Sequence, residues 1–207
     1  MEAANKNIVT TIADTVRNSP NGSLFFSNSF PEYDDEYVGH IMSDLVKGGE
    51  LYRLGRGIYL KSKKTRFGIV YPELDYIAKA IGERDNADIL PTGAMALNML
   101  GLSTQIPMKP TYITTGSARV IEIDGRTIIF KRAVPKNFAI KGKKRSIIVQ
   151  AMKALGKKNM TQELVNKIQT LIRENPEIET LENDYRYMPT WIRRIFQKTI
   201  KGYQIVI

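Results

Sequence analysis

The chain has 207 residues, of which 43% are hydrophobic and 25% are charged, and its formal net charge is +10. It contains no cysteine, which excludes disulfides, thiolate metal sites and cysteine nucleophiles. The first residues contain no apolar signal core, and no apolar run approaches the ~20 residues of a membrane span. We therefore expect a cytoplasmic protein that makes no membrane contact.

The first elements are a helix, a strand and a short second helix. Apolar residues at helical spacing predict a first helix that ends at the breaker cluster of residues 19–22. The apolar residues 24–26 predict a short strand. A short second helix is expected next, with Pro31 in its first turn. Three residues are candidate N-caps for it: Ser27, Asn28 and Ser29.

A third helix is predicted over residues 34–47, because Asp34 is a good N-cap and Gly48 a good stop signal. Its apolar positions share one side, and we expect them to be buried: Tyr37, Val38, Ile41, Met42, Leu45 and Val46. The other side carries the remaining residues: Glu36, Gly39, His40, Ser43, Asp44 and Lys47. This face is poor in arginine, asparagine and glutamine, which most often read base edges.

Residues 51–60 predict a hairpin whose turn, Gly55-Arg56-Gly57, carries the arginine at its tip because glycine permits a positive φ. Basic residues follow the hairpin directly. A helix, a glycine and a hairpin with a basic tip and tail are typical of a winged helix-turn-helix, in which a helix enters the major groove beside the phosphate-contacting wing. We therefore predict that residues 1–68 bind double-stranded DNA. The expected contact residues are Ser27, Asn28, His40, Ser43, Lys47, Arg53, Arg56, Lys61, Lys63, Lys64 and Arg66.

Residues 69–207 predict a second domain, which makes the whole chain α+β. It should combine a small, largely antiparallel sheet with C-terminal helices. Asp124-Gly125 is the favoured two-residue turn of a hairpin. Helices are expected over residues 72–84, 94–102, 145–155, 161–173 and 190–201. Strands are expected over residues 111–114, 120–123, 126–130 and 203–207.

The positive charge is concentrated in three blocks. Residues 50–66 hold six basic residues and one acidic residue, residues 126–145 hold eight and none, and residues 193–207 hold four and none. Such segregation favours phosphate contacts over uniform solubilising charge. A solvated strand and loop explains the block at 126–145 equally well, so the sequence leaves open whether this block contacts nucleic acid.

The residues give no argument for an enzyme. Gly116-Ser117 followed by Glu122 and Asp124 is similar to a nucleotidyltransferase pattern, but the gap is too short for the intervening helix. His40 is the only histidine, and no plausible metal ligands accompany it. We expect no catalytic residue, no cofactor and no metal.

Two segments carry a family resemblance. LYRLGRGIYL, at residues 51–60, resembles the N-terminal wing of the AbiEi-type antitoxins of abortive-infection (type IV) toxin–antitoxin pairs. TGAMALNMLGL, at residues 92–102, is similar to a helix in the second domain of those proteins. The resemblance covers about residues 5–135 and is most marked for an uncharacterised bacterial branch of DUF6088-like proteins.

The resemblance implies a DNA-binding autorepressor, or antitoxin, that controls a two-gene operon. The second gene would encode a nucleotidyltransferase-like toxin as its functional partner. The matching wing positions are Arg53, Arg56, Lys61, Lys63 and Lys64. The alternative is a protein-interaction module, without specific DNA binding, that docks a partner such as a toxin. Salt-dependent binding to duplex DNA distinguishes the two.

Overall fold

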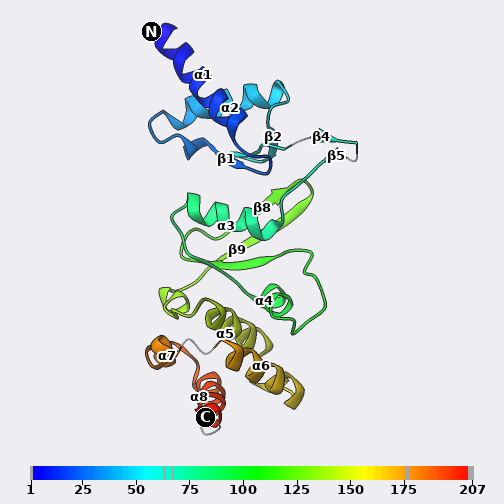
Figure 1. Cartoon of the computed structure of the whole chain (residues 1–207), viewed down its shortest axis with the longest axis vertical. Coiled ribbons are helices and arrows are strands. Elements are labelled where there is room, and N and C mark those ends of the chain that lie inside the picture. Colours follow the sequence, from blue (N-terminus) through cyan, green and yellow to red (C-terminus); the bar gives the residue numbers. More distant parts are fainter. Residues whose placement is uncertain (1, 63, 67, 176–177, 205–207) are drawn as a thin grey trace. The chain divides into compact units, whose positions relative to one another are not determined.

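The computed structural model describes residues 2–62, 64–66, 68–175 and 178–204 (Figure 1). The chain contains both helices and small sheets, so the predicted α+β class is confirmed. It divides into two compact units, residues 1–86 with 121–126 and residues 87–120 with 127–207. The first unit extends past the boundary at residues 68 and 69 that the sequence suggests, because helix α3 (Leu74–Arg84) contacts strand β1 (Leu24–Phe26).

The first unit is built around a three-stranded antiparallel sheet in the order β1-β3-β2. Strand β3 is central, and its Leu60 lies opposite both Leu24 of β1 and Tyr52 of β2. The elements before and around this sheet are, in chain order, α1 (Glu2–Asn18), β1, the 3-10 turn η1 (Ser27–Ser29), α2 (Asp35–Lys47), β2 (Tyr52–Gly55) and β3 (Ile58–Leu60). Their buried core consists of Ile12, Ala13, Val16, Phe25, Phe30, Val38, Ile41, Met42, Leu45, Leu51 and Tyr59.

The prediction for α2 is confirmed in its cap and its buried side. The Asp34 carboxylate accepts the backbone N–H groups of Glu36 and Tyr37 at 3.0 Å each, as an N-cap does. Four of the six predicted core residues are buried, whereas Tyr37 and Val46 are half-buried at the edge of the core. The helix therefore presents one apolar side to the core of the first unit.

The second helix that the sequence predicts after residue 27 does not form. Residues 27–29 make only a 3-10 turn, and Pro31 lies beyond it. The Ser29 hydroxyl accepts the N–H of Phe26 at 2.8 Å. This side chain therefore links the turn to the end of β1 and does not cap a longer helix. Two short strands that the sequence did not predict, β4 (Lys64–Thr65) and β5 (Gly68–Ile69), pair antiparallel in the basic tail.

The second unit contains a mixed sheet in the order β6-β7-β9-β8. Strand β6 (Ile89–Pro91) is antiparallel to β7 (Thr111–Thr114), whereas β7 is parallel to β9 (Arg126–Arg132). The parallel pair was not expected. Strand β8 (Arg119–Ile123) joins β9 through Asp124 and Gly125, which have φ of +48° and +72° and so form the predicted two-residue turn.

Helices complete the second unit, and Figure 1 shows α5, α6, α7 and α8 following one another in the C-terminal part of the chain. They are α4 (Gly93–Met99), α5 (Lys143–Leu155), α6 (Gln162–Glu174), α7 (Ile178–Asp184) and α8 (Thr190–Gln204), with 3-10 turns η2 (Pro135–Phe138), η3 (Lys157–Asn159) and η4 (Tyr185–Tyr187). None of the described helices is both long and apolar enough to cross a membrane.

Three details of the second unit differ from the sequence-based expectation. Helix α4 ends at Met99, three residues early, because the chain turns at Gly101 with φ of +65°. Helix α7 was not expected. The predicted strand at residues 203–207 is wrong at its start, because Tyr203 and Gln204 belong to α8, and residues 205–207 lie outside the described residues.

A buried ion pair fixes the start of α5. Arg145 is 2% exposed and Asp184 is not exposed at all, and the guanidinium Nη1 of Arg145 binds Oδ2 of that carboxylate. Nη1 also donates to Thr180 Oγ1 at 3.1 Å. The carboxylate accepts the backbone N–H groups of Lys141 at 3.0 Å and Gly142 at 3.5 Å. The first turn of α5 contains only basic charge, which the helix dipole disfavours. Asp184 supplies the negative charge that this end of the helix otherwise lacks.

Removing that carboxylate charge should unfold the second unit more easily. Asp184→Asn leaves the Arg145 cation buried without a counter-charge, so we expect a loss of about 3–5 kcal/mol of unfolding free energy. Urea denaturation monitored by circular dichroism measures it. The matched control is Glu182→Gln, on the same helix but exposed, which should change stability by less than about 0.5 kcal/mol. Equal effects of the two variants would contradict a special role for Asp184.

Candidate nucleic-acid interface

The exposed side of α2 carries more negative than positive charge. His40 and Lys47 are exposed, and Ser43 is half-buried with its hydroxyl donating to the Gly39 carbonyl at 2.8 Å. Lys47 pairs with Asp44 at 2.8 Å, and its hydrogen bond lowers the pKa of the Asp44 carboxylate below the usual value. The acidic residues of the cap and this face are Asp34, Asp35, Glu36 and Asp44. Of the predicted contact residues on α2, His40 is exposed and lies on the same face as Asp44, whose carboxylate feels its charge.

Ser27 lies where η1, α2 and the wing meet. A Cβ added to Gly39 would lie 3.8 Å from the Ser27 hydroxyl oxygen, and one added to Gly57 would lie 3.7 Å from it. The side chain of Ser27 is half-buried. Two glycines, one on α2 and one in the wing, therefore bring the helix and the hairpin close to the same serine.

The wing, residues 52–60, presents two exposed arginines. Arg56 lies in the turn between β2 and β3, and Arg53 lies on β2 with its Nε donating weakly to the Gly55 carbonyl at 3.4 Å. Gly57 has φ of +67°, as the predicted turn requires. Gly55 does not have a positive φ. A Cβ on it would lie 3.0 Å from the Glu122 carbonyl oxygen, so this glycine is needed for close approach of another segment.

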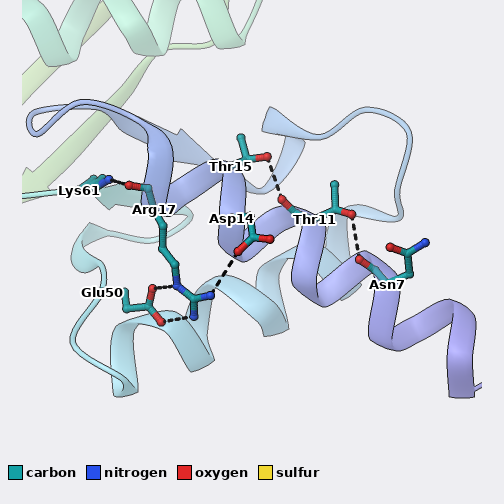
Figure 2. A network of polar contacts seen from close by, with 7 residues as sticks. All are labelled: Asn7, Thr11, Asp14, Thr15, Arg17, Glu50 and Lys61. Atoms are coloured by element: carbon teal, nitrogen blue, oxygen red, sulfur yellow. Dashed lines mark hydrogen bonds and ion pairs between the residues drawn. The ribbon is translucent and has the colours of Figure 1, made fainter.

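Lys61 is engaged within the protein. Its ammonium donates to the backbone carbonyl of Arg17, in the last turn of α1 (Figure 2), and at 2.6 Å to that of Ser19, directly after the helix. The side chain is half-buried. A cation is favourable at a helix C-terminus, where carbonyl groups lack helical partners. We therefore assign Lys61 to capping α1 instead of the predicted phosphate contact.

An ion-paired network stands beside Lys61 (Figure 2). Arg17 binds the Glu50 carboxylate in a bidentate manner, with Nε–Oε2 of 2.6 Å and Nη2–Oε1 of 2.8 Å, and its Nη1 reaches Asp14 at 3.4 Å. Hydrogen bonding from Arg17 lowers the pKa of Glu50. The pair joins the end of α1 to the loop before β2. Arg17 is consequently unavailable as an unpaired surface cation.

The remaining predicted contacts are distributed around the unit. Lys63 lies outside the described residues, Lys64 is the first residue of β4, and Arg66 is exposed in the turn between β4 and β5. Asn28 is exposed, and its amide donates at 3.5 Å to the carbonyl of Arg84 at the end of α3. It borders a hollow of about 450 Å³ lined by Leu24, Phe26, Asn28, Ser29, Tyr76, Ala80, Glu83 and Arg84. Asn28 is thus directed toward α3.

The tip of the β8–β9 hairpin is a neighbour of the wing that the sequence did not predict. Residues 121–126 belong to the first unit. The Arg126 guanidinium lies 5.3 Å from the centre of the Tyr71 ring. Burial and a hydrogen bond with Asp124 raise the pKa of the Tyr71 hydroxyl. Nothing local in the sequence links these residues to the wing, since they are more than 50 positions apart.

The described residues offer no metal centre. Among them, no three histidine, cysteine, aspartate or glutamate side chains are grouped closely enough to hold an ion. What the first unit brings together is instead a helix, a glycine-rich turn and exposed arginines. Such an arrangement offers groups that can contact a polyanion or a protein.

The capping role of Lys61 can be measured as stability. Lys61→Met keeps the aliphatic stem but removes two charge-assisted hydrogen bonds, so we expect a loss of about 1–3 kcal/mol in unfolding free energy. Urea denaturation provides the measurement. Lys47→Met, which removes an exposed ion pair, is the control and should cost less than about 1 kcal/mol. Unchanged stability in Lys61→Met would return this lysine to the candidate DNA contacts.

The comparisons with known proteins place the chain in a family without assigning a function. No curated protein matches it. The model of a family described as "Family of unknown function (DUF6088)" matches residues 11–180. The link to AbiEi-type antitoxins stays a prediction. Because the match covers well over half of the sequence, the protein belongs to the DUF6088 family.

Proposed function

We propose that residues 2–60 are a winged helix-turn-helix and that the protein is a DNA-binding transcriptional regulator. The observation that carries this proposal is the connectivity: helix, strand, turn, helix and hairpin, with β3 paired between β1 and β2. In this assignment α2 is the recognition helix, the hairpin of β2 and β3 is the wing, and η1 occupies the place of the second helix.

The affinity in this proposal comes mainly from the wing. Arg53, Arg56 and Arg66 are exposed, and guanidinium groups bind phosphate oxygens by paired hydrogen bonds. The acidic residues at the start of α2 repel phosphates, so the helix would enter the groove by its middle, near His40. We therefore expect strong salt dependence and modest sequence preference.

The specific form that we propose is autorepression of a two-gene operon, with the protein as the antitoxin of a nucleotidyltransferase-like toxin. Support for this form comes from the resemblance of residues 51–60 and 92–102 to AbiEi-type antitoxins. Sequencing the neighbouring reading frame tests it directly. A partner gene without nucleotidyltransferase motifs would contradict this form and leave the DNA-binding proposal standing.

A second candidate is docking of a partner protein through α2. The observation that favours it is the charge of the exposed side, where three acidic residues of the helix, Asp35, Glu36 and Asp44, outnumber the one basic residue, Lys47. A basic partner surface would complement this face. In this case the wing would contribute contacts to the protein partner and not to phosphates.

Truncating the wing arginine should weaken DNA binding without unfolding the protein. We expect Arg56→Ala to reduce affinity for promoter duplex by about 1–3 kcal/mol, because one guanidinium contact is lost. Fluorescence anisotropy at fixed salt measures it. The control is Lys79→Ala on α3, an exposed cation paired with Asp75 at 2.5 Å. If the two variants bind alike, the wing is not a DNA contact.

Neutralising the start of α2 separates the two candidate functions. Asp35→Asn with Glu36→Gln should raise affinity for every duplex several-fold if α2 faces DNA, because repulsion of phosphates is removed. The N-cap Asp34 is left intact so that the helix is preserved. Titrations with operator and scrambled duplex provide the readout. Unchanged DNA affinity together with lost binding of the neighbouring gene's product would favour protein docking.

A further inference from the structure

A long part of the second unit lacks acidic residues. Residues 125–162 contain eleven lysines and arginines and no aspartate or glutamate. Runs of like charge repel one another, and such blocks often bind partners of opposite charge. The structure separates the cations of this segment that face solvent from those that do not.

Five of the cations are exposed within thirteen consecutive residues. They lie at the end of β9, in η2, just before α5 and at its first residue: Lys131, Arg132, Lys136, Lys141 and Lys143. We call these five residues the basic strip. Arg145, by contrast, is buried in its ion pair with Asp184.

The strip is folded against α5 and not merely contiguous in sequence. Lys153 of α5 donates from Nζ to Asn137 Oδ1 in η2 at 2.7 Å, which holds η2 beside the helix. Burial and the nearby charge of Lys136 lower the pKa of the Lys153 ammonium. A further cation thus lies near Lys136, which adds to the positive charge of this region.

No carboxylate compensates the strip in the part of the chain that is described. The Asp184 carboxylate accepts the backbone N–H groups of residues 141 and 142, but it is buried and already paired with Arg145. No ion pair involves any of the five strip side chains among the described residues. Their charge is therefore directed to solvent.

We propose that the basic strip is a second, sequence-independent binding surface for the phosphate backbone of duplex DNA. Four of its five residues are lysines, which act on phosphates as point charges, whereas lysine is depleted in protein–protein interfaces. Single-stranded nucleic acid is bound on exposed aromatic platforms. The aromatic residues of the segment, Phe130 and Phe138, are buried and half-buried respectively. Charge complementarity and this lack of a stacking surface favour the duplex.

This inference goes beyond the proposed function, because it rests on residues of the second unit and does not require the winged helix. The test uses the full-length protein with all five strip residues changed to glutamine. A 30-base-pair duplex without operator sequence is the probe, and its affinity is measured by anisotropy between 50 and 300 mM KCl. The matched control removes five exposed cations elsewhere in the same unit: Lys167, Arg173, Arg186, Lys198 and Lys201.

The strip variant should bind the duplex at least tenfold more weakly at low salt. Each lost phosphate contact should reduce the slope of log affinity against log salt by about 0.9. The control variant should keep most of its affinity. Acetylation of the strip lysines in the wild-type protein, read by mass spectrometry, should be suppressed by the duplex, which tests the surface without any substitution.

Three results would overturn the proposal. They are an unchanged salt slope with unprotected lysines, an equal loss in the control, or a loss confined to single-stranded RNA of the same length. The wing variants Arg53→Ala and Arg56→Ala, measured in parallel, keep the two proposals apart. If only the wing variants bind normally, the DNA-binding role of the wing is contradicted and the strip proposal stands. If only the strip variant binds normally, the strip proposal is contradicted and the role of the wing stands.

Discussion

The second unit depends on one carboxylate, that of Asp184. It neutralises the buried guanidinium of Arg145 and receives two backbone N–H groups at the start of α5. Taking two opposite charges out of water is unfavourable, and the pair is tolerated because hydrogen bonds to Thr180 and to the backbone complete it. The geometry leaves little freedom in how α7 meets α5.

In the first unit, the C-terminus of helix α1 is stabilised by positive charge. The carbonyls of Arg17 and Ser19, at the end of α1, accept hydrogen bonds from the Lys61 ammonium, and the Arg17 guanidinium is held by Glu50. Lys61 and Arg17, which both count toward the positive net charge, are thus engaged in contacts within the first unit. Among the described side chains of residues 52–66, the exposed cations are therefore arginines: Arg53, Arg56 and Arg66.

Local patterns predicted what local forces determine. The cap at Asp34, the apolar side of α2, the positive φ of Gly57 and the Asp124-Gly125 turn were all readable from short windows. What was missed depends on distant contacts. Lys61 finds Arg17 across 44 positions, and Arg145 finds Asp184 across 39. Helix α7 was not predicted, and the expected helix after residue 27 is replaced by a 3-10 turn.

The discontinuity of the first unit constrains how the chain can be divided. Residues 121–126 return to it from far along the sequence. Their backbone lies against Gly55, and Asp124 hydrogen-bonds Tyr71. A fragment ending at residue 86 would expose the flank of the wing and strip Tyr71 of that hydrogen bond. The N-terminal unit is therefore complete only when residues 121–126 are present.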